Sequence, residues 1–346
     1  MLDLRHMNLE DHKQRINLPK LVGNTQMKKI FLVALCTTMG TCVMAQSAIT
    51  EKEIKDHIWY LASPKMKGRF PGTAGNNKAA DYLVKQFKKS GISPFGNSYF
   101  QEFTAKMRVK KGVTDTPYVQ TKNVVGFIEG SDPKLKNEYI VIGAHYDHLG
   151  MGGASSKKPD TVAVHPGADD NASGTAALLE ISEKLAANKA SLKRSIIIIA
   201  FSAEEQGLLG SKYFTEHPLV PLSQIKLMIN MDMVGRMNTE KHLYMGGAAS
   251  FDGGMELMKS LGPKIGINPI VNAYDVGGSD HVSFYKKNIP VLGFHTGGHP
   301  QYHTPEDDRK LINIAGEKLV CDYIYEALTT IANRNEPILF VPEKKM

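Results

Sequence analysis

The stretch that decides the fold is residues 195–205, Ser-Ile-Ile-Ile-Ile-Ala-Phe-Ser-Ala-Glu-Glu. Its apolar, β-branched run is typical of a strand that is buried on both faces of a sheet. Two carboxylates, Glu204 and Glu205, follow this run. Open α/β sheets bind their ligands at the carboxyl ends of parallel strands. The stretch therefore predicts a central strand and an acidic pair at the ligand-binding edge.

The rest of the chain contains more short apolar runs of the same kind. Further short apolar runs predict strands over residues 123–128, 139–144, 227–231 and 289–294. Helical periodicity lies between or around them, at residues 50–61, 79–87, 173–185, 205–214 and 311–332. An alternation of strands and helices is typical of a three-layer α/β/α sandwich with a mostly parallel central sheet, which is the fold class we expect.

Composition excludes several classes of protein. The 346 residues are 42% hydrophobic and 22% charged, which is typical of a globular protein and excludes a disordered or fibrous chain. Three cysteines, Cys36, Cys42 and Cys321, cannot build a disulfide scaffold or a thiolate cluster, so a metal must be held by His, Asp and Glu. The whole chain has a net charge of +7, but the part beyond Ala45 has 36 basic and 32 acidic residues and a net charge of only +4. So small a positive charge argues against a nucleic-acid partner.

The N-terminal segment has the features of a leader. Two lysines at 28–29, an apolar run and the small residues before Gln46 predict a signal peptide over residues 27–45. Residues 1–26 then form a gene-model extension or a disordered arm, and residues 46–346 a single domain. The apolar run is shorter than the roughly 20 residues of a spanning helix, so we expect a periplasmic or secreted protein without a stable membrane span. A lipid anchor at Cys36 is disfavoured by the bulky Leu35.

Ionisable residues gather at the predicted strand ends. His145 and Asp147 follow residues 139–144, and Asp232 follows residues 227–231. Two loops, residues 167–174 and 301–305, add Asp169, Asp170 and His303. Carboxylates brought this close together repel one another unless cations neutralise them. Divalent cations are therefore expected at this edge.

The donor types favour zinc. Imidazole and carboxylate without thiolate suit zinc, cobalt or manganese better than calcium. The residues allow one ion at His145 and Asp232 and another at Glu205 and His303, with a carboxylate of the Asp169–Asp170 pair between them. Taken singly, each motif has an ordinary explanation, such as a helix cap or a surface pair. Their common position at one sheet edge argues for a joint role.

The ordered motifs resemble those of metallopeptidase family 28, the co-catalytic zinc aminopeptidases typified by bacterial leucyl aminopeptidase. The similarity spans about residues 50–335 and includes Gly278–His281, which is similar to a segment common in the family. The motifs are His145-Tyr-Asp147, Asp169-Asp-Asn-Ala-Ser-Gly174, Glu204-Glu-Gln-Gly-Leu-Leu-Gly-Ser211, Asp232 and Tyr302-His-Thr-Pro305.

The resemblance implies a role for each matching ligand residue. His145 and Asp232 would bind one zinc ion, Glu205 and His303 the other, and Asp170 would bridge the two, followed by a cis peptide bond. Asp169 is then not a ligand. We leave His148, His165, His295 and His299 outside the ligand set, and expect Arg69 in solvent and residues 152–158 as a loop over the cleft.

The remaining site residues act on the ligands or on the substrate. Asp147 would accept the second ring hydrogen of His145, and Asp280 is a second supporting carboxylate. Glu204 would be the general base, its side chain opposite to that of Glu205 because strand side chains alternate. Tyr302 would donate its hydroxyl to the developing oxyanion.

The implied activity is removal of N-terminal residues from peptides with a free α-amine, through a metal-bridging hydroxide. Two alternatives from other classes remain. A glutaminyl cyclase relative catalyses acyl transfer with a single zinc ion, although the Glu204–Ser211 stretch resembles the peptidase branch. A catalytically silent binding relative would have little need of an intact ligand set and Glu204. The oligomeric state is open.

Overall fold

The computed structural model describes residues 48–109 and 114–343. Internal contacts divide the chain into Met1–Gln46 and Ser47–Met346, and the description below concerns the second unit. The predicted signal peptide at residues 27–45 and the segment before it lie outside the described residues. Within the described ranges, no helix has the length and apolar character needed to cross a membrane.

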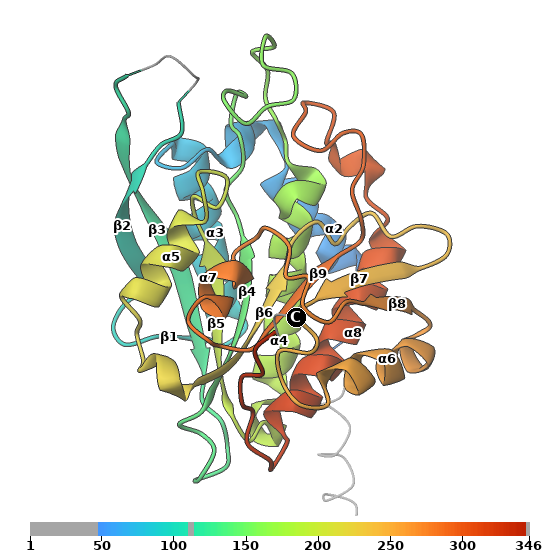
Figure 1. Ribbon diagram of the computed structural model, residues 1–346. Helices are drawn as coiled ribbons and strands as arrows, with labels where there is room; N and C mark the ends of the chain where they lie inside the picture. The colour runs from blue at the N-terminus through green and yellow to red at the C-terminus, as the bar shows by residue number, and fades with distance from the viewer. Residues whose placement is uncertain (1–47, 110–113, 344–346) are drawn as a thin grey trace, which may run out of the picture. The chain divides into compact units, whose positions relative to one another are not determined.

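One mixed sheet forms the centre of the described unit (Figure 1). Its strand order is β1-β3-β5-β4-β6-β9-β7-β8, with β2 paired to β3. Strands β5, β4, β6 and β9 run parallel, whereas β3 and β7 are antiparallel to their neighbours β5 and β9. The strands are β1 (Ser93–Pro94), β2 (Phe100–Lys106), β3 (Tyr118–Ile128), β4 (Tyr139–His145), β5 (Ser195–Phe201), β6 (Ile225–Met231), β7 (His242–Gly246), β8 (Asn268–Val271) and β9 (Val291–His295). The predicted parallel sheet is confirmed at its centre, whereas antiparallel pairs occur on both sides of it and the marginal pair β7–β8 is parallel.

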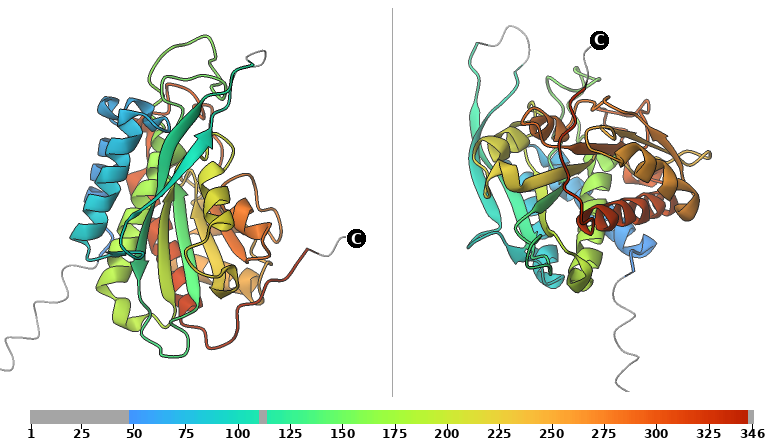
Figure 2. Two further views of the ribbon diagram at one scale, coloured as in Figure 1. Left: turned by 90° about the vertical axis from the view of Figure 1, so that its left-hand side faces the viewer. Right: turned by 60° about the horizontal axis from the view of Figure 1, so that its bottom comes forward.

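Helices cover both faces of this sheet (Figure 2). One layer contains α2 (Glu51–Leu61), α3 (Ala74–Lys89), α4 (Gly174–Ala187), α6 (Gly254–Ile265) and α8 (Ile314–Ala332). The other contains α5 (Leu209–Glu216) and α7 (His281–Tyr285). Short helical turns lie at Pro64–Arg69, Ala168–Ser173, Lys189–Ser191, Leu222–Gln224 and Arg309–Leu311. The predicted three-layer α/β/α architecture is present.

Strand β5 shows why its sequence is apolar throughout. Every residue from Ser195 to Phe201 is buried. Ile196 and Ile198 pack in the cluster beneath α4 and α8, whereas Ile197 and Ile199 pack in the cluster with Phe214 of α5. Because side chains alternate along a strand, a central strand covered on both faces requires an apolar residue at each position.

Helix boundaries follow local chemistry. The side chain of Thr50 accepts the backbone N–H of Glu53 and caps α2, as the capping box predicts. The helix predicted over residues 205–214 instead begins at Leu209. Residues 204–208 form a turn in which the N–H groups of Gly207 and Leu208 each donate to the Glu204 carbonyl at 2.8 Å.

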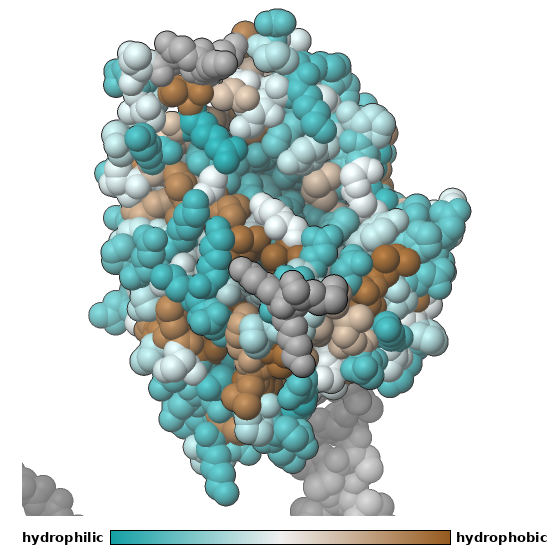
Figure 3. Space-filling model, viewed as in Figure 1, coloured by the Kyte–Doolittle hydropathy of each residue, from teal (hydrophilic) through white to brown (hydrophobic). Residues whose placement is uncertain are grey.

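The face seen in Figure 3 is mainly hydrophilic, since most large apolar side chains lie in the two layers beside the sheet.

Candidate active site

The strand ends bring the predicted site residues to one edge of the sheet. His145 is the last residue of β4 and is in register with Phe201, three residues before Glu204. Asp232 follows β6, and its N–H donates to the carbonyl of Phe294 in β9 at 3.1 Å. Because these four central strands are parallel, the residues after them share the carboxyl edge, as expected.

Three of the predicted ligands form a first group of donor atoms. His145 Nε2 lies 3.2 Å from Asp170 Oδ1 and 3.4 Å from Asp232 Oδ1. One donor atom from each residue lies within 4.8 Å of the other two. His145 and Asp170 are buried and Asp232 is partly exposed, so the group has one side open toward solvent.

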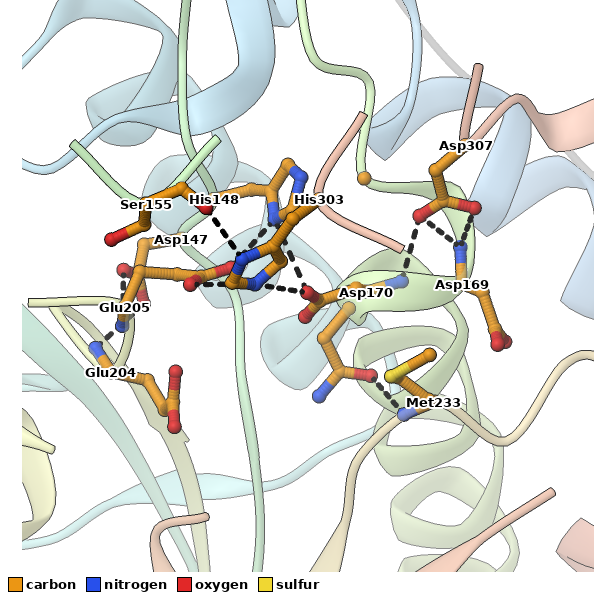
Figure 4. Close-up of polar contacts among 12 residues, drawn as sticks. Asp147, His148, Ser155, Asp169, Asp170, Glu204, Glu205, Met233, His303 and Asp307 are labelled. Carbon is orange, nitrogen blue, oxygen red and sulfur yellow. Dashed lines mark hydrogen bonds and ion pairs between the residues drawn. The ribbon is translucent and has the colours of Figure 1, made fainter. Parts of the chain in front are cut away.

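A second group uses the other oxygen of Asp170 (Figure 4). His303 Nε2 lies 3.1 Å from Asp170 Oδ2 and 3.1 Å from Glu205 Oε2. Asp170 therefore faces one imidazole with each carboxylate oxygen, which is the arrangement a bridging ligand needs. The geometry brings together all five residues assigned as ligands from the sequence.

His148 also belongs to this second group, although the sequence analysis left it outside. Its side chain is fully buried, and Nδ1 lies 2.8 Å from Glu205 Oε1 and 3.7 Å from Asp170 Oδ2. His148, Asp170 and Glu205 place donor atoms within 4.8 Å of one another. A lone histidine one residue after Asp147 carries no periodic signal, so only the folded loop reveals its position.

The protonation of the two imidazoles reflects an excess of negative charge. Burial opposes the charged form of His145, but Asp232 and Glu204 raise its pKa well above the ordinary value. Burial likewise opposes protonation of His303, yet hydrogen bonds to Asp170 and Glu205 raise its pKa to about 10. Metal ligands must lose such protons, and a bound cation supplies the same neutralisation. Clustered imidazole and carboxylate donors without thiolate fit zinc.

The loop around Asp170 is held in place through its own backbone N–H groups. The Asp307 carboxylate accepts the N–H groups of Asp169 and Asp170 at 3.0 Å each. The Asp170–Asn171 peptide bond is cis, as the family resemblance implies. Asp169 points away from the donor groups, since its Oδ1 accepts the Gly235 N–H at 2.7 Å (Figure 4). The two adjacent aspartates therefore point in different directions, Asp170 toward the donor groups and Asp169 toward the backbone of Gly235.

Asp147 acts differently from the expectation. Its carboxylate lies 3.7 Å from His145 Nδ1, too long for a hydrogen bond, whereas its own backbone carbonyl is 3.2 Å from that nitrogen. The buried carboxylate instead lies 3.1 Å from the N of Glu204 and 3.4 Å from the N of Glu205. Asp147 therefore orients the turn that presents both glutamates, because two backbone donors compete successfully for its oxygens.

Glu204 and Glu205 diverge for a reason other than the predicted strand alternation. They lie in the turn after β5, not in the strand, and their carboxylates point to different sides of that turn (Figure 4). Burial, together with the charges of Glu205 and Asp232, raises the pKa of Glu204 well above the ordinary value, although His145 opposes this shift. Cations bound beside it would also lower that pKa.

Tyr302 and Asp280 lie close to Glu204. Tyr302 lines two cavities, of about 300 and 330 Å³, that Glu204 also lines, and its ring stacks on His303 with centroids 3.8 Å apart. Asp280 is fully buried, and within the described part of the chain neither of its carboxylate oxygens has a hydrogen-bond partner. Burial, with the charges of Asp147 and Asp232, raises the pKa of Asp280 to about 7 although His145 opposes the shift. Asp280 is close to the site without entering either donor group.

Arg69 was expected in solvent and is instead fully buried. Its guanidinium donates to the carbonyls of Tyr146, Leu61, Pro166 and Gly167 at 2.7–2.9 Å. The first and last of these carbonyls belong to the loops that carry His145 and Asp170. Burial lowers the pKa of Arg69 to about 10, while Asp147 and Asp170 act in the opposite direction. The prediction that Arg69 is solvated was wrong. Its carbonyl acceptors come mainly from loops that are distant in the sequence, and nothing in the sequence around Arg69 indicates them.

Comparison with known proteins agrees with these motifs. The family model described as Peptidase family M28 matches residues 123–328. Aminopeptidase YwaD of Bacillus subtilis is 30% identical over 250 residues, which are 67% of this chain and 50% of that protein, so the chain spans half the length of this relative.

Two solved structures share the fold at low identity. A zinc aminopeptidase from Bacillus subtilis has a TM-score of 0.65 at 19% identity, covering 86% of this chain and all of its own. Porphyromonas gingivalis glutaminyl cyclase has a TM-score of 0.66 at 21% identity, covering 82% and 99%. These likenesses show the fold alone. The family match covers more than half of the chain and includes strands β4 to β9 and all five candidate ligands. The chain therefore belongs to peptidase family M28.

Proposed function

We propose that this protein is an exported di-zinc aminopeptidase that removes N-terminal residues from peptides. The observation that carries the proposal is the pair of donor groups joined by Asp170, with Glu204 beside them. His145 and Asp232 would hold one ion and Glu205 and His303 the other. Family membership and the name of the Bacillus relative support peptidase activity. Export rests on the leader predicted over residues 27–45.

The chemistry divides between the ions and the chain. Bound zinc ions supply Lewis acidity, which lowers the pKa of water and polarises a carbonyl oxygen. Glu204 then accepts the proton of the attacking water and delivers it to the leaving amine. Tyr302 lines the same space and donates its hydroxyl to the oxyanion that develops on the substrate.

The N-terminal residue of the substrate would occupy the cavity of about 300 Å³. Asp170, Glu204 and Asp232 line it, and no lysine or arginine among the described residues does. Carboxylates attract an α-ammonium group and repel a carboxylate, so this cavity favours the N-terminal end of a peptide.

Zinc content and leucine release test the proposal together. We expect two zinc ions per chain by elemental analysis and release of leucine from an N-terminal leucyl anilide. The Glu204→Gln variant should retain both ions and lose leucine release by about 10²-fold or more, the usual contribution of a general base. Normal release by that variant would remove Glu204 from this role.

The structural likeness to a glutaminyl cyclase defines the alternative outcome. One zinc ion per chain, no leucine release and cyclisation of an N-terminal glutaminyl peptide would place the protein with acyl transfer. Two ions with neither reaction would favour a silent binding protein.

A further inference from the structure

We propose that Arg108 and Lys212 form a subsite for a carboxylate on the residue that follows the scissile bond. This inference rests on the proposed function and adds a substrate class. The favoured substrates are dipeptides with a free C-terminus or peptides with an acidic second residue. Both provide one carboxylate within a residue of the bond that is cleaved.

The subsite belongs to the second cavity beside Glu204. This cavity, of about 330 Å³, is lined by Glu204, Glu205, Tyr302 and His303 on the side of the site, and by Arg108 and Lys212 opposite. Arg108 lies just beyond β2, and Lys212 lies in the first turn of α5. Two distant segments of the chain thus place cations in one cavity.

Both cations converge on Gly207. Lys212 Nζ donates to the Gly207 carbonyl at 2.7 Å. A Cβ atom built on Gly207 would lie 3.4 Å from Arg108 Nη2, so the guanidinium packs over this glycine. The Arg108 backbone N–H also donates to Gln206 Oε1 at 2.9 Å, which fixes the chain beside the turn. Among the described residues, neither cation forms an ion pair with a carboxylate.

Charge gives the two cavities opposite preferences. The cavity of about 300 Å³ is lined by Asp170, Asp232 and Asp275 and, over residues 48–109 and 114–343, by no lysine or arginine. An α-ammonium group is therefore favoured there, and a carboxylate is favoured beside Arg108 and Lys212. Glu204 and Tyr302 line both cavities, which places the scissile bond between them. Successive Cα atoms are about 3.8 Å apart, so a carboxylate that enters the second cavity belongs to the next residue.

Three substrates separate the possible sources of the carboxylate. The zinc-loaded protein is assayed with Leu-Gly, Leu-Gly-NH₂ and Leu-Asp-NH₂ for kcat/KM. We expect Leu-Gly and Leu-Asp-NH₂ to exceed Leu-Gly-NH₂ by about fivefold or more, a moderate effect because both cations are partly hydrated. Preference for Leu-Gly alone assigns the subsite to the C-terminal carboxylate, and preference for Leu-Asp-NH₂ alone assigns it to an acidic side chain.

Variants test whether the named cations cause this preference. Arg108→Gln and Lys212→Met should each reduce kcat/KM for the carboxylate substrates about fivefold more than for Leu-Gly-NH₂. Lys85→Met, at an exposed lysine of α3, is the matched control and should leave the ratio unchanged. Equal rates for the three substrates in the wild type, or variants that lose the same factor in kcat/KM for all three substrates, would overturn the subsite while the aminopeptidase proposal stands.

A binding measurement separates failure of the subsite from failure of the proposed function. Calorimetry with the Glu204→Gln variant compares the Kd of Leu-Gly and Leu-Gly-NH₂ without turnover. Tighter binding of Leu-Gly that is lost in the double variants with Arg108→Gln or Lys212→Met supports the subsite even if no substrate is cleaved. Equal binding of the two compounds contradicts it.

Discussion

At the residue scale, adjacent side chains differ in role because the backbone aims them apart. Asp170 offers one oxygen to His145 and the other to His303, whereas the neighbouring Asp169 accepts the Gly235 N–H. The same applies to Glu205, which faces His303, and Glu204, whose carboxylate points to another side of the same turn. The two acidic pairs are therefore asymmetric, and each member has a distinct consequence when it is changed.

Asp170→Ala should lose both zinc ions, because one carboxylate serves both donor groups. Elemental analysis after dialysis measures the metal that remains. Asp169→Asn is the matched control, since an amide oxygen still accepts the Gly235 N–H, and it should keep both ions. Two tightly bound ions in Asp170→Ala would move the bridge to another residue.

His148→Ala should weaken binding of the ion at Glu205 and His303 by about 10- to 100-fold, the usual effect of losing a residue that orients a ligand. The Nδ1 atom lies 2.8 Å from Glu205 Oε1, so it is placed to donate to that oxygen and leave Oε2 facing His303. His148→Asn, which keeps a donor near the same place, should restore part of the affinity. Competition with a zinc chelator measures it, and unchanged affinity in His148→Ala would contradict the role.

At the scale of the elements, loops that follow different strands are tied by buried polar side chains. Asp147, after β4, lies within reach of the backbone N–H groups of the turn after β5. Arg69, the last residue of the turn Pro64–Arg69, donates to loops on either side of the cluster, and Asp307 holds the loop before α4. The donor groups are thus assembled by backbone contacts between loops as well as by the strands.

Arg69→Met should lower the free energy of unfolding by about 2–4 kcal/mol, because four buried carbonyls lose their donor. Urea unfolding of the zinc-loaded protein measures the change. Lys67→Met, two residues away on an exposed side chain, serves as the control and should change stability by less than about 0.5 kcal/mol. Equal stability of the Arg69 variant and the wild type would show that water replaces the guanidinium without cost.

At the scale of the whole molecule, the sheet edge carries a concentration of buried charge. Carboxylates and imidazoles from the ends of β4, β5 and β6 and from two loops meet where two cavities open. Metal ions that bind the folded arrangement and not the unfolded chain stabilise the fold by mass action. Metal content and global stability should therefore be linked.

Removal of zinc should lower the melting temperature by about 5–15 °C, which corresponds to a few kcal/mol for a chain of this size. Scanning calorimetry before and after chelation measures the shift, and zinc added back should reverse it. Glu204→Gln serves as a comparison because it should respond to chelation as the wild type does. An unchanged melting temperature, with loss of metal verified by elemental analysis, would contradict the link.

The layers of the fold and the identity of the donor residues could be predicted from the sequence alone. Strands β5, β4 and β6 are mainly apolar because both faces of the sheet are covered, and such a run can be recognised within a few residues of sequence. Strands β1 and β8 have only two and four residues, and their partly exposed or mixed sequences carry no comparable signal.

Which atoms face one another depends on tertiary contacts that the sequence does not reveal. The positions of His148 and Arg69, the backbone target of Asp147 and the meeting of Arg108 with Lys212 all depend on contacts between segments that are distant in the sequence. Such contacts arise from loop geometry rather than from periodicity, so residue spacing cannot predict them. The sequence therefore determined which donors the edge contains, and the packing of its loops decided how those donors are arranged.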